Sequence, residues 1–185
     1  MNTPQIRKIL KASIPIDYYT EVLPCDKLNL VPNKPFAIVI NSDTSDSPGA
    51  HWLAIFMKRG SKEVEFFDSC AMPVKFYNSF VGSFLSSKAT KTRLNTVRLQ
   101  SGDSNACGQY CIYFLLHRIV GIPYDRILQK FSAVDLECND IIVQEFMRHN
   151  FGGDSAEDAL DCENELKDLV QLSEVVSFIL GYDIK

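Results

Sequence analysis

The stretch from Leu99 to His117, LQSGDSNACGQYCIYFLLH, joins a polar loop directly to an apolar segment. Gly, Ser, Asp and Asn residues favour a loop before Cys107, and apolar residues are nearly continuous from there to Val120. Gly121 is a natural stop. This pattern predicts a buried helix that begins at Cys107. A thiol at a helix N-terminus faces the positive end of the helix dipole, which favours the reactive thiolate.

Two interpretations of Cys107 remain open on these local grounds. In the first, the thiolate attacks a carbonyl, the N–H groups of the helix end hold the oxyanion, and Gly108 lets a substrate backbone approach closely. In the second, Cys107 is a small apolar residue that opens a core helix. Cys111 lies one turn deeper on the same helix face, which makes it the better candidate for a core cysteine.

The rest of the chain predicts an α+β fold. The 185 residues have the size of one domain, and we expect a catalytic core at about 15–120 followed by a helical portion at about 121–185. The expected architecture is a small mixed or antiparallel sheet packed against the helix that begins at Cys107, with further helices at the C-terminus. The expected strands are 36–40, 51–58, 63–69 and 95–99, and the expected helices are 3–12, 74–86, 107–120, 123–131, 140–150 and one or two within 155–180.

Composition narrows the classes of function. No apolar run reaches the roughly 18 residues that a membrane span needs, so we expect no membrane partner. The formal net charge of -4 argues against a large nucleic-acid surface, and the most basic stretch, 88–93, is expected to be a solvated loop. Composition leaves the oligomeric state open.

The N-terminal sequence has no apolar signal-peptide core, so we expect an intracellular protein that is not secreted. The six cysteines are then expected to be free thiols rather than a disulfide framework. No C-x-x-C motif and only three histidines occur, so the sequence predicts no metal site.

His51 is the best candidate for a base beside Cys107. His117 lies inside the apolar helix, and His149 lies near a helix end, where structural roles are expected. His51 instead begins a strand after a Pro-Gly loop and precedes Trp52, the only tryptophan. Such a position allows a base to face a cleft, although an exposed strand-end histidine is an equally good interpretation of His51 alone.

Asp68 and Gln100 complete the candidate set. Asp68 lies 17 residues after His51, at the end of the next strand, and the start of one antiparallel strand lies beside the end of its neighbour. A carboxylate at the edge of the buried run VEFF needs a partner, which His51 provides. Gln100, seven residues before Cys107, could donate its amide to an oxyanion or could be an ordinary loop residue.

Together, GAHWLAIF, FFDSC and LQSGDSNACGQYCIYFLLH resemble the adenovirus-type cysteine proteases and their relatives in adenovirus-like DNA transposons. The resemblance covers roughly residues 18–117, and the ubiquitin-like-protein proteases are more distant relatives. It implies that Cys107 is the nucleophile, His51 the base and Asp68 its orienter, with Gln100 as an oxyanion donor beside the Cys107 N–H. It also implies cleavage of peptide bonds near glycine and maturation of capsid or core proteins, in a host nucleus or virion.

The resemblance implies a further set of expectations. Trp52 either forms part of the substrate cleft or packs under His51. A peptide or nucleic-acid activator is implied as well, although the chain is acidic, the acid is Asp where those enzymes usually have Glu, and 86–99 holds no cysteine that could tether a peptide. The acidic C-terminal portion could give equivalent support in cis. The pair Gly152-Gly153 is either a helix stop or a site of self-cleavage.

The sequence leaves two other functions to be tested. One is a protease of ubiquitin-like modifiers, which would need a surface that docks a folded modifier. The other is an inactive relative that serves as a binding module, against which the complete set of His, Asp, Gln and Cys argues. No cofactor is required by the sequence under any of these functions.

Overall fold

The structure is a computed structural model that describes residues 1–152. Five strands form one mixed sheet in the order β1-β2-β3-β4-β5. The central strands β2, β3 and β4 are antiparallel, and β1 and β5 join the two edges in parallel. The strands are β1 (Val22–Pro24), β2 (Phe36–Asn41), β3 (Trp52–Met57), β4 (Glu63–Phe67) and β5 (Lys91–Leu94). The expected α+β class with a mixed sheet is confirmed.

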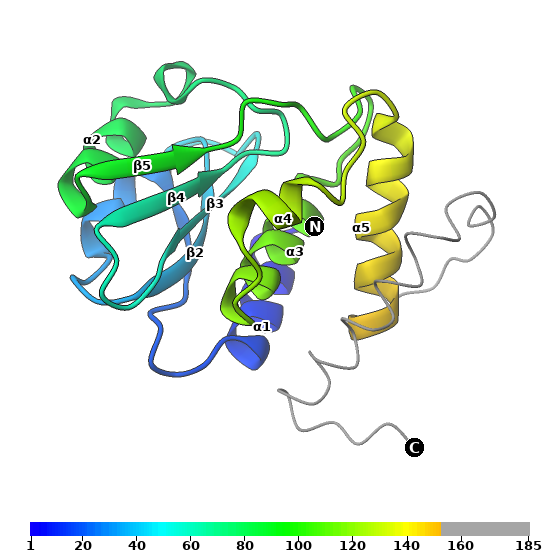
Figure 1. The fold of residues 1–185 in the computed structure, drawn as a ribbon. Coiled ribbons are helices and arrows are strands. Elements are labelled where there is room, and N and C mark those ends of the chain that lie inside the picture. The colour runs from blue at the N-terminus through cyan, green and yellow to red at the C-terminus, as the bar shows by residue number, and fades with distance from the viewer. Residues whose placement is uncertain (153–185) are drawn as a thin grey trace.

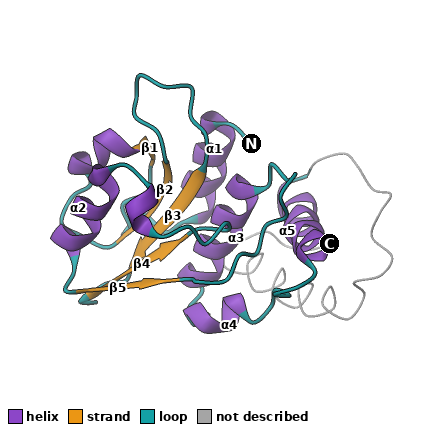
Figure 2. Cartoon of the chain, turned by 90° about the horizontal axis from the view of Figure 1, so that it is seen from above, coloured by secondary structure: helices purple, strands orange, loops and turns teal. Residues whose placement is uncertain are grey.

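Helices cover both faces of this sheet, so that the molecule has three layers (Figures 1 and 2). Helix α2 and the 3-10 helix η1 pack on one face, and α1 and α3 lie on the other, with α4 and α5 beyond them. The helices are α1 (Thr3–Ser13), η1 (Cys25–Leu30), η2 (Val74–Phe76), α2 (Ser79–Lys88), α3 (Cys107–Ile119), α4 (Tyr124–Leu128) and α5 (Leu136–Phe151). Because both faces are covered, β2 and β3 consist of nearly continuous apolar residues.

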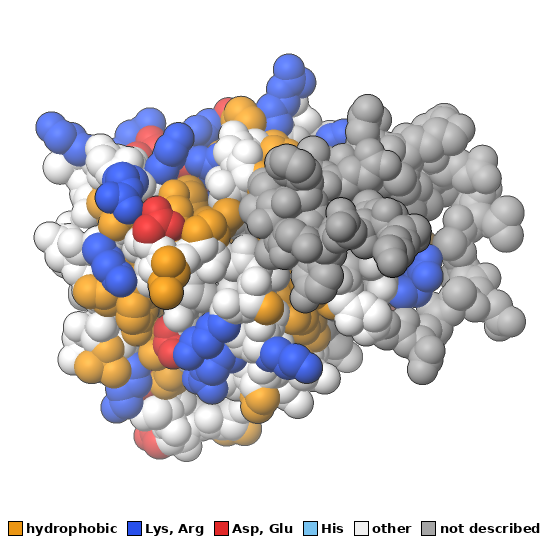
Figure 3. All heavy atoms as spheres, turned by 90° about the horizontal axis from the view of Figure 1, so that it is seen from below, with side chains coloured by type: hydrophobic (Ala, Val, Ile, Leu, Met, Phe, Trp, Pro, Cys, Tyr) orange, Lys and Arg blue, Asp and Glu red, His pale blue; other side chains and the backbone are white. Residues whose placement is uncertain are grey.

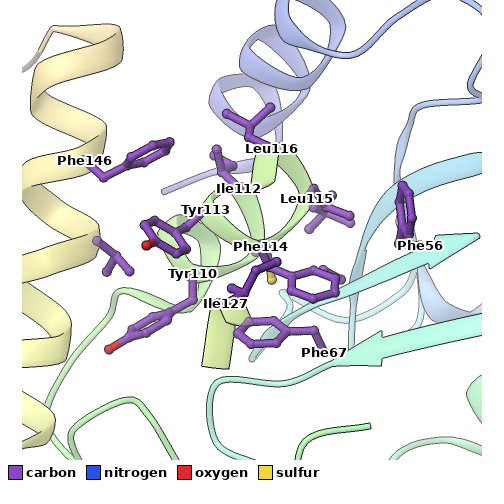
Figure 4. Close-up of a cluster of buried hydrophobic side chains, with 14 of the residues drawn as sticks. Phe56, Phe67, Tyr110, Ile112, Tyr113, Phe114, Leu115, Leu116, Ile127 and Phe146 are labelled. Carbon is purple, nitrogen blue, oxygen red and sulfur yellow. The ribbon is translucent and has the colours of Figure 1, made fainter. Parts of the chain in front are cut away.

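Helix α3 is the centre of the larger core, as its apolar sequence predicts. Nearly every residue from Gly108 to His117 is buried, because the sheet, α1, α4 and α5 surround the helix. The ring of Phe114 stacks on that of Phe67 with centroids 4.6 Å apart (Figure 4). Tyr124 meets Phe114 edge-on. Phe146 of α5 packs edge-on against Tyr113.

A buried ion pair fixes the C-terminal end of α3 to the sheet. Arg118 donates from Nε and Nη2 to the two carboxylate oxygens of Glu65 on β4, at 2.6 and 2.7 Å. This bidentate geometry satisfies both carboxylate oxygens, and the guanidinium also lies over the ring of Phe56. The ion pair therefore holds α3 against the sheet in one orientation. This orientation determines where the other end of the helix, Cys107, lies.

The expected strand at 95–99 is wrong, and so is the expected solvated loop at 88–93. Strand β5 consists of Lys91–Leu94, a polar edge strand whose residues carry no apolar alternation. Residue Asn95 leaves the sheet, because its side-chain amide donates to the carbonyl oxygens of Asp68 and Val97. That side chain thus bonds to loop backbone rather than extending a strand.

Asparagine or aspartate side chains cap the starts of α1, α2 and α5. Helix α1 begins at Thr3, as expected, where Asn2 caps it and forms a capping box with Gln5. Asn78 caps α2 after η2, which splits the helix expected at 74–86. Helix α5 begins at Leu136, four residues before the expected 140, because the Asp135 side chain caps it by accepting from Cys138 N.

Helix α5 ends at Phe151, and Gly152 caps it with a positive φ of 66°, as a Gly stop requires. Gly153, the expected helices within 155–180 and any support they give in cis lie outside the described residues.

Lys and Arg side chains are dispersed on the face seen in Figure 3, where hydrophobic, acidic and other polar side chains separate them. Among residues 1–152, no helix is long and apolar enough to cross a membrane.

We expect Phe114→Ala to lower the free energy of unfolding by about 3–5 kcal/mol, because it leaves a cavity between the sheet and α4. Urea denaturation measures this loss. Phe76→Ala is the matched control, since Phe76 is 66% exposed and its removal should change stability by less than about 0.5 kcal/mol. Equal losses in the two variants would contradict a core centred on α3.

Candidate active site

His51 and Asp68 meet at one end of the sheet, as the strand order predicts. His51 immediately precedes β3 and Asp68 immediately follows β4, its antiparallel neighbour. The imidazole Nε2 of His51 lies 2.7 Å from Oδ1 of Asp68. The expected contact between the two residues is therefore confirmed as a hydrogen bond, and it leaves Nδ1 of His51 for a different partner.

Asp68 is a fully partnered buried carboxylate. It is 1% exposed, and besides His51 its oxygens accept from Cys70 N at 2.9 Å, Met72 N at 2.7 Å and Tyr77 Oη at 2.5 Å. The two N–H groups come from a tight turn in which Ala71 adopts a left-handed φ of 52°. Burial raises the pKa of Asp68, but the hydrogen bonds from His51 and Tyr77 outweigh burial and hold this pKa below its usual value.

Cys107 is the other partner of His51. It is the first residue of α3, whose start no side chain caps and whose first turn holds no acidic residue. Burial raises the pKa of the Cys107 thiol, but hydrogen bonds from His51 and from the Trp52 backbone N–H bring this pKa below its usual value. Burial likewise lowers the pKa of His51, while the hydrogen bonds with Asp68 and Cys107 raise it to about 9.

These opposite shifts favour a thiolate–imidazolium pair over a neutral thiol and imidazole. Each charged form stabilises the other, and Asp68 stabilises the imidazolium from its far side. The N–H groups at the start of α3 face the thiolate, in line with the helix-dipole argument from the sequence. The arrangement joins a thiol of lowered pKa, an imidazole of raised pKa and a buried carboxylate, a set of groups that can support acyl transfer through a thioester.

Gln100 is buried beside the loop that leads to Cys107. It is 3% exposed; its Nε2 donates to the carbonyl of Ser104 at 2.7 Å, and its Oε1 accepts from Ser69 Oγ at 2.6 Å. The alternative of a solvated loop residue is thus wrong for Gln100. The loop is braced by Ser104 Oγ, which accepts from Ala106 N.

A cleft with a volume of about 560 Å³ reaches Cys107. Trp52 lines it, and the indole Nε1 donates to the carbonyl of Met1 at 3.2 Å, so that the tryptophan and the N-terminal residues form adjoining parts of the wall. Of the two expected positions for Trp52, the structure places it in the wall of the cleft. The ring that stacks on His51 is that of Tyr77.

Gly108 differs from the expectation that it faces a substrate. It is buried and does not line the cleft. A Cβ added to it would lie 3.2 Å from Ile6 Cδ1 and 3.3 Å from both Met1 Cβ and Trp52 Cδ1. The glycine therefore allows α1 and the Trp52 ring to pack against α3, which places the cleft wall.

His51, Asp68 and Cys70 have potential ligand atoms within 4.8 Å of one another, a spacing that a metal ion could bridge. The oxygens of Asp68 already accept four hydrogen bonds, however, and burial raises the pKa of the Cys70 thiol. A metal ion would have to displace these donors. The donor set fits the hydrogen-bond network better than it fits a resident metal.

Cys111 and His117 both lie in the core rather than at the cleft. Cys111 is buried, as expected, and burial raises its pKa well above the usual value. Cys25, Cys70, Cys107 and Cys111 are free thiols, while Cys138 is not, which departs from the expectation for that residue. His117 is buried in the core, where its Nδ1 lies 2.6 Å from the carbonyl of Tyr113.

Three residues of the site were not found by sequence reasoning. Tyr77 donates to Asp68, with its ring parallel to that of His51 at 6.5 Å; Asn95 holds both backbone groups of Asp68; and Ser69 holds Gln100. Tyr77 and Asn95 lie in segments expected to be a helix and a strand, so no local pattern marks them. The sequence did offer an indication for Ser69, because this residue directly follows the candidate Asp68 within the quoted stretch FFDSC.

Parts of the chain are similar to known viral proteases. No family model matches the chain. The candidate thiol protease R355 of Acanthamoeba polyphaga mimivirus is 27% identical over 101 residues, which are 51% of this chain and 33% of that protein. The chain thus spans about a third of the length of this curated relative.

Two crystal structures of the ASFV pS273R protease also match. One is 20% identical with a TM-score of 0.45 and covers 68% of this chain and 58% of its own. The other, of the selenomethionine protein, is 24% identical with a TM-score of 0.38 and covers 59% and 43%.

We expect iodoacetamide to alkylate Cys107 with a pH midpoint below the ordinary value for a cysteine thiol, because the thiolate forms early. The rate against pH, followed by mass spectrometry, gives this midpoint. In His51→Ala the midpoint should move upward, since the imidazolium that stabilises the thiolate is lost. Cys70 provides an internal comparison, because its pKa is raised and its alkylation should begin only at higher pH. Identical profiles for the two thiols would contradict the ion pair.

Proposed function

We propose that this chain is a cysteine endopeptidase in which Cys107 is the nucleophile, His51 the general acid and base, and Asp68 the residue that orients His51. One observation carries the proposal: the His51 imidazole is held between a buried carboxylate and a thiol at the uncapped start of α3. The similarity to a viral thiol protease supports the same class of chemistry.

The proposed reaction proceeds through an acyl-enzyme. The Cys107 thiolate forms a C–S bond to the scissile carbonyl carbon, and the carbonyl oxygen becomes an oxyanion held by the Cys107 N–H and the Gln100 amide. As the C–N bond breaks, the His51 imidazolium gives its proton to the leaving amine. Water then attacks the thioester while neutral His51 takes its proton, and the thiolate leaves as the C–S bond breaks.

The cleft supports an extended, uncharged peptide as the substrate. Most of its lining is neutral, from small polar residues such as Asn41, Thr44 and Asn105 to apolar ones such as Leu23 and Pro48. Among the side chains that line it, the one cation is Arg7, which is paired with Glu21. We propose glycine near the scissile bond, as in the proteases that the sequence resembles, and maturation of viral or virus-like capsid and core precursors as the process.

The first test is cleavage of a Gly-Gly peptide by the full chain and by Cys107→Ala. We expect turnover by the wild type and none above background by the variant, because no thiolate remains. Asp68→Asn should keep the fold but lower kcat roughly 10³- to 10⁴-fold, since the amide cannot stabilise the imidazolium. Arg59→Gln, a change at an exposed ion pair with Asp17, should leave kcat unchanged. Equal cleavage by wild type and Cys107→Ala would contradict the proposed nucleophile.

A second experiment separates this proposal from the rival function on ubiquitin-like modifiers. Folded modifiers bearing C-terminal electrophiles are incubated with the chain, alongside a short Gly-Gly peptide bearing the same electrophile. We expect the peptide probe to label Cys107 at least as fast as any folded modifier, because the cleft is the binding site we infer. Labelling by one modifier roughly 100-fold faster than by the peptide would instead favour the rival function.

A further inference from the structure

Ser69 connects the end of β4 to Leu99 and Gln100 by three hydrogen bonds. It follows Asp68 directly and is completely buried. Its carbonyl oxygen accepts from the backbone N–H groups of Leu99 and Gln100, at 2.8 and 3.1 Å, and its hydroxyl lies 2.6 Å from Gln100 Oε1. The backbone bonds place Gln100 beside Ser69, and the hydroxyl contacts only the end of its side chain.

The partners of Gln100 determine which way its amide points. The carbonyl of Ser104 can only accept, so the group 2.7 Å from it must be the NH₂ of Gln100. The amide oxygen therefore faces Ser69, whose hydroxyl must be the donor. One N–H of the amide is used by Ser104 in the loop that leads to Cys107, and the second N–H is the one that the proposed function assigns to the oxyanion.

We propose that Ser69 is a positioning residue that fixes the orientation of the Gln100 amide. The inference rests on the proposed function, in which Gln100 donates to the oxyanion. If the hydroxyl is removed, a buried amide oxygen loses its donor, and the side chain can rotate or turn over. A turned amide presents an acceptor where the oxyanion forms, which opposes the reaction rather than assisting it.

Consecutive residues thus hold the two halves of the site. Asp68 orients His51, the proposed base, and Ser69 orients Gln100, the proposed oxyanion donor. Asn95 holds both backbone groups of Asp68, at 3.1 and 2.6 Å, so the segment itself has little freedom to shift. The distance between base and oxyanion donor is then set by one short stretch of backbone.

Ser69→Ala isolates the hydroxyl, because the backbone bonds from Ser69 to Leu99 and Gln100 remain. Ser13→Ala is the matched control: Ser13 is also buried, and its hydroxyl has no hydrogen-bond partner among residues 1–152. Both variants delete one buried oxygen from a serine, but only one of these oxygens touches Gln100. Thermal unfolding by circular dichroism confirms that both variants are folded before activity is compared.

The full chain is assayed with a Gly-Gly peptide. We expect kcat of Ser69→Ala to fall roughly 10- to 100-fold. Gln100→Ala removes the oxyanion donor itself, so its loss of kcat should be at least as large, roughly 100- to 1000-fold. KM should stay within about twofold, because the oxyanion exists only in the transition state. Ser13→Ala should match the wild type in both constants.

Two chemical probes separate positioning of the oxyanion donor from general damage. Iodoacetamide reacts with the Cys107 thiolate and forms no oxyanion, so its rate and pH midpoint should be the same in Ser69→Ala and wild type. A Gly-Gly peptide aldehyde forms a hemithioacetal whose oxygen occupies the oxyanion position. Its inhibition constant should rise by the factor by which kcat/KM falls. Parallel losses in alkylation and turnover would overturn the inference, because Ser69 would then support the whole site.

A double-mutant cycle gives the last measurement. In a Gln100→Ala background, Ser69→Ala should cause no further loss, since the hydroxyl acts only through the amide. Full additivity, or a Ser69→Ala variant as active as Ser13→Ala, would overturn the role of Ser69 while leaving the proposed function intact. A wild-type chain that neither cleaves the peptide nor binds the aldehyde contradicts the proposed function itself, and with it the role of Ser69.

Discussion

The burial of α3 is the constraint on which the rest of the structure depends. A helix that is apolar on nearly all sides must be covered all round, and the sheet, α1, α4 and α5 each cover one part of it. At its far end the Arg118–Glu65 pair fixes the helix to β4. The opposite end of the helix begins at Cys107, which lines the cleft. The packing that buries α3 therefore also determines where Cys107 lies.

The end of β4 plays the corresponding part for the polar half of the site. Asp68 gathers four donors, two of them backbone N–H groups from a turn in which Ala71 accepts a left-handed φ. A non-glycine residue in this conformation costs about 1–2 kcal/mol. The turn is retained because it satisfies a buried charge whose desolvation would otherwise cost more. The strained turn at Ala71 therefore supports the carboxylate of Asp68, which in turn binds His51.

The sequence was informative where function depends on chain order and spacing. His51 and Asp68 could be paired because antiparallel strands bring fixed positions together, and the α3 start could be placed because its loop and apolar run are adjacent. Strand β5 was missed because Lys91–Leu94 has no apolar pattern and owes its conformation to a parallel neighbour. Gly108 was misassigned because its contact, Ile6, is remote in sequence. Tyr77 and Asn95 likewise contact Asp68 through tertiary hydrogen bonds that no local pattern encodes.

The bond between the Trp52 indole and the Met1 carbonyl has a practical consequence. It makes Met1 part of the wall that leads to Cys107, although 106 positions separate the two residues along the chain. An affinity tag or fusion partner joined to the Met1 nitrogen would therefore emerge at the mouth of the cleft. We expect the length and charge of such an extension to alter substrate access, so recombinant preparations that differ only in their leading residues are not interchangeable in kinetic work.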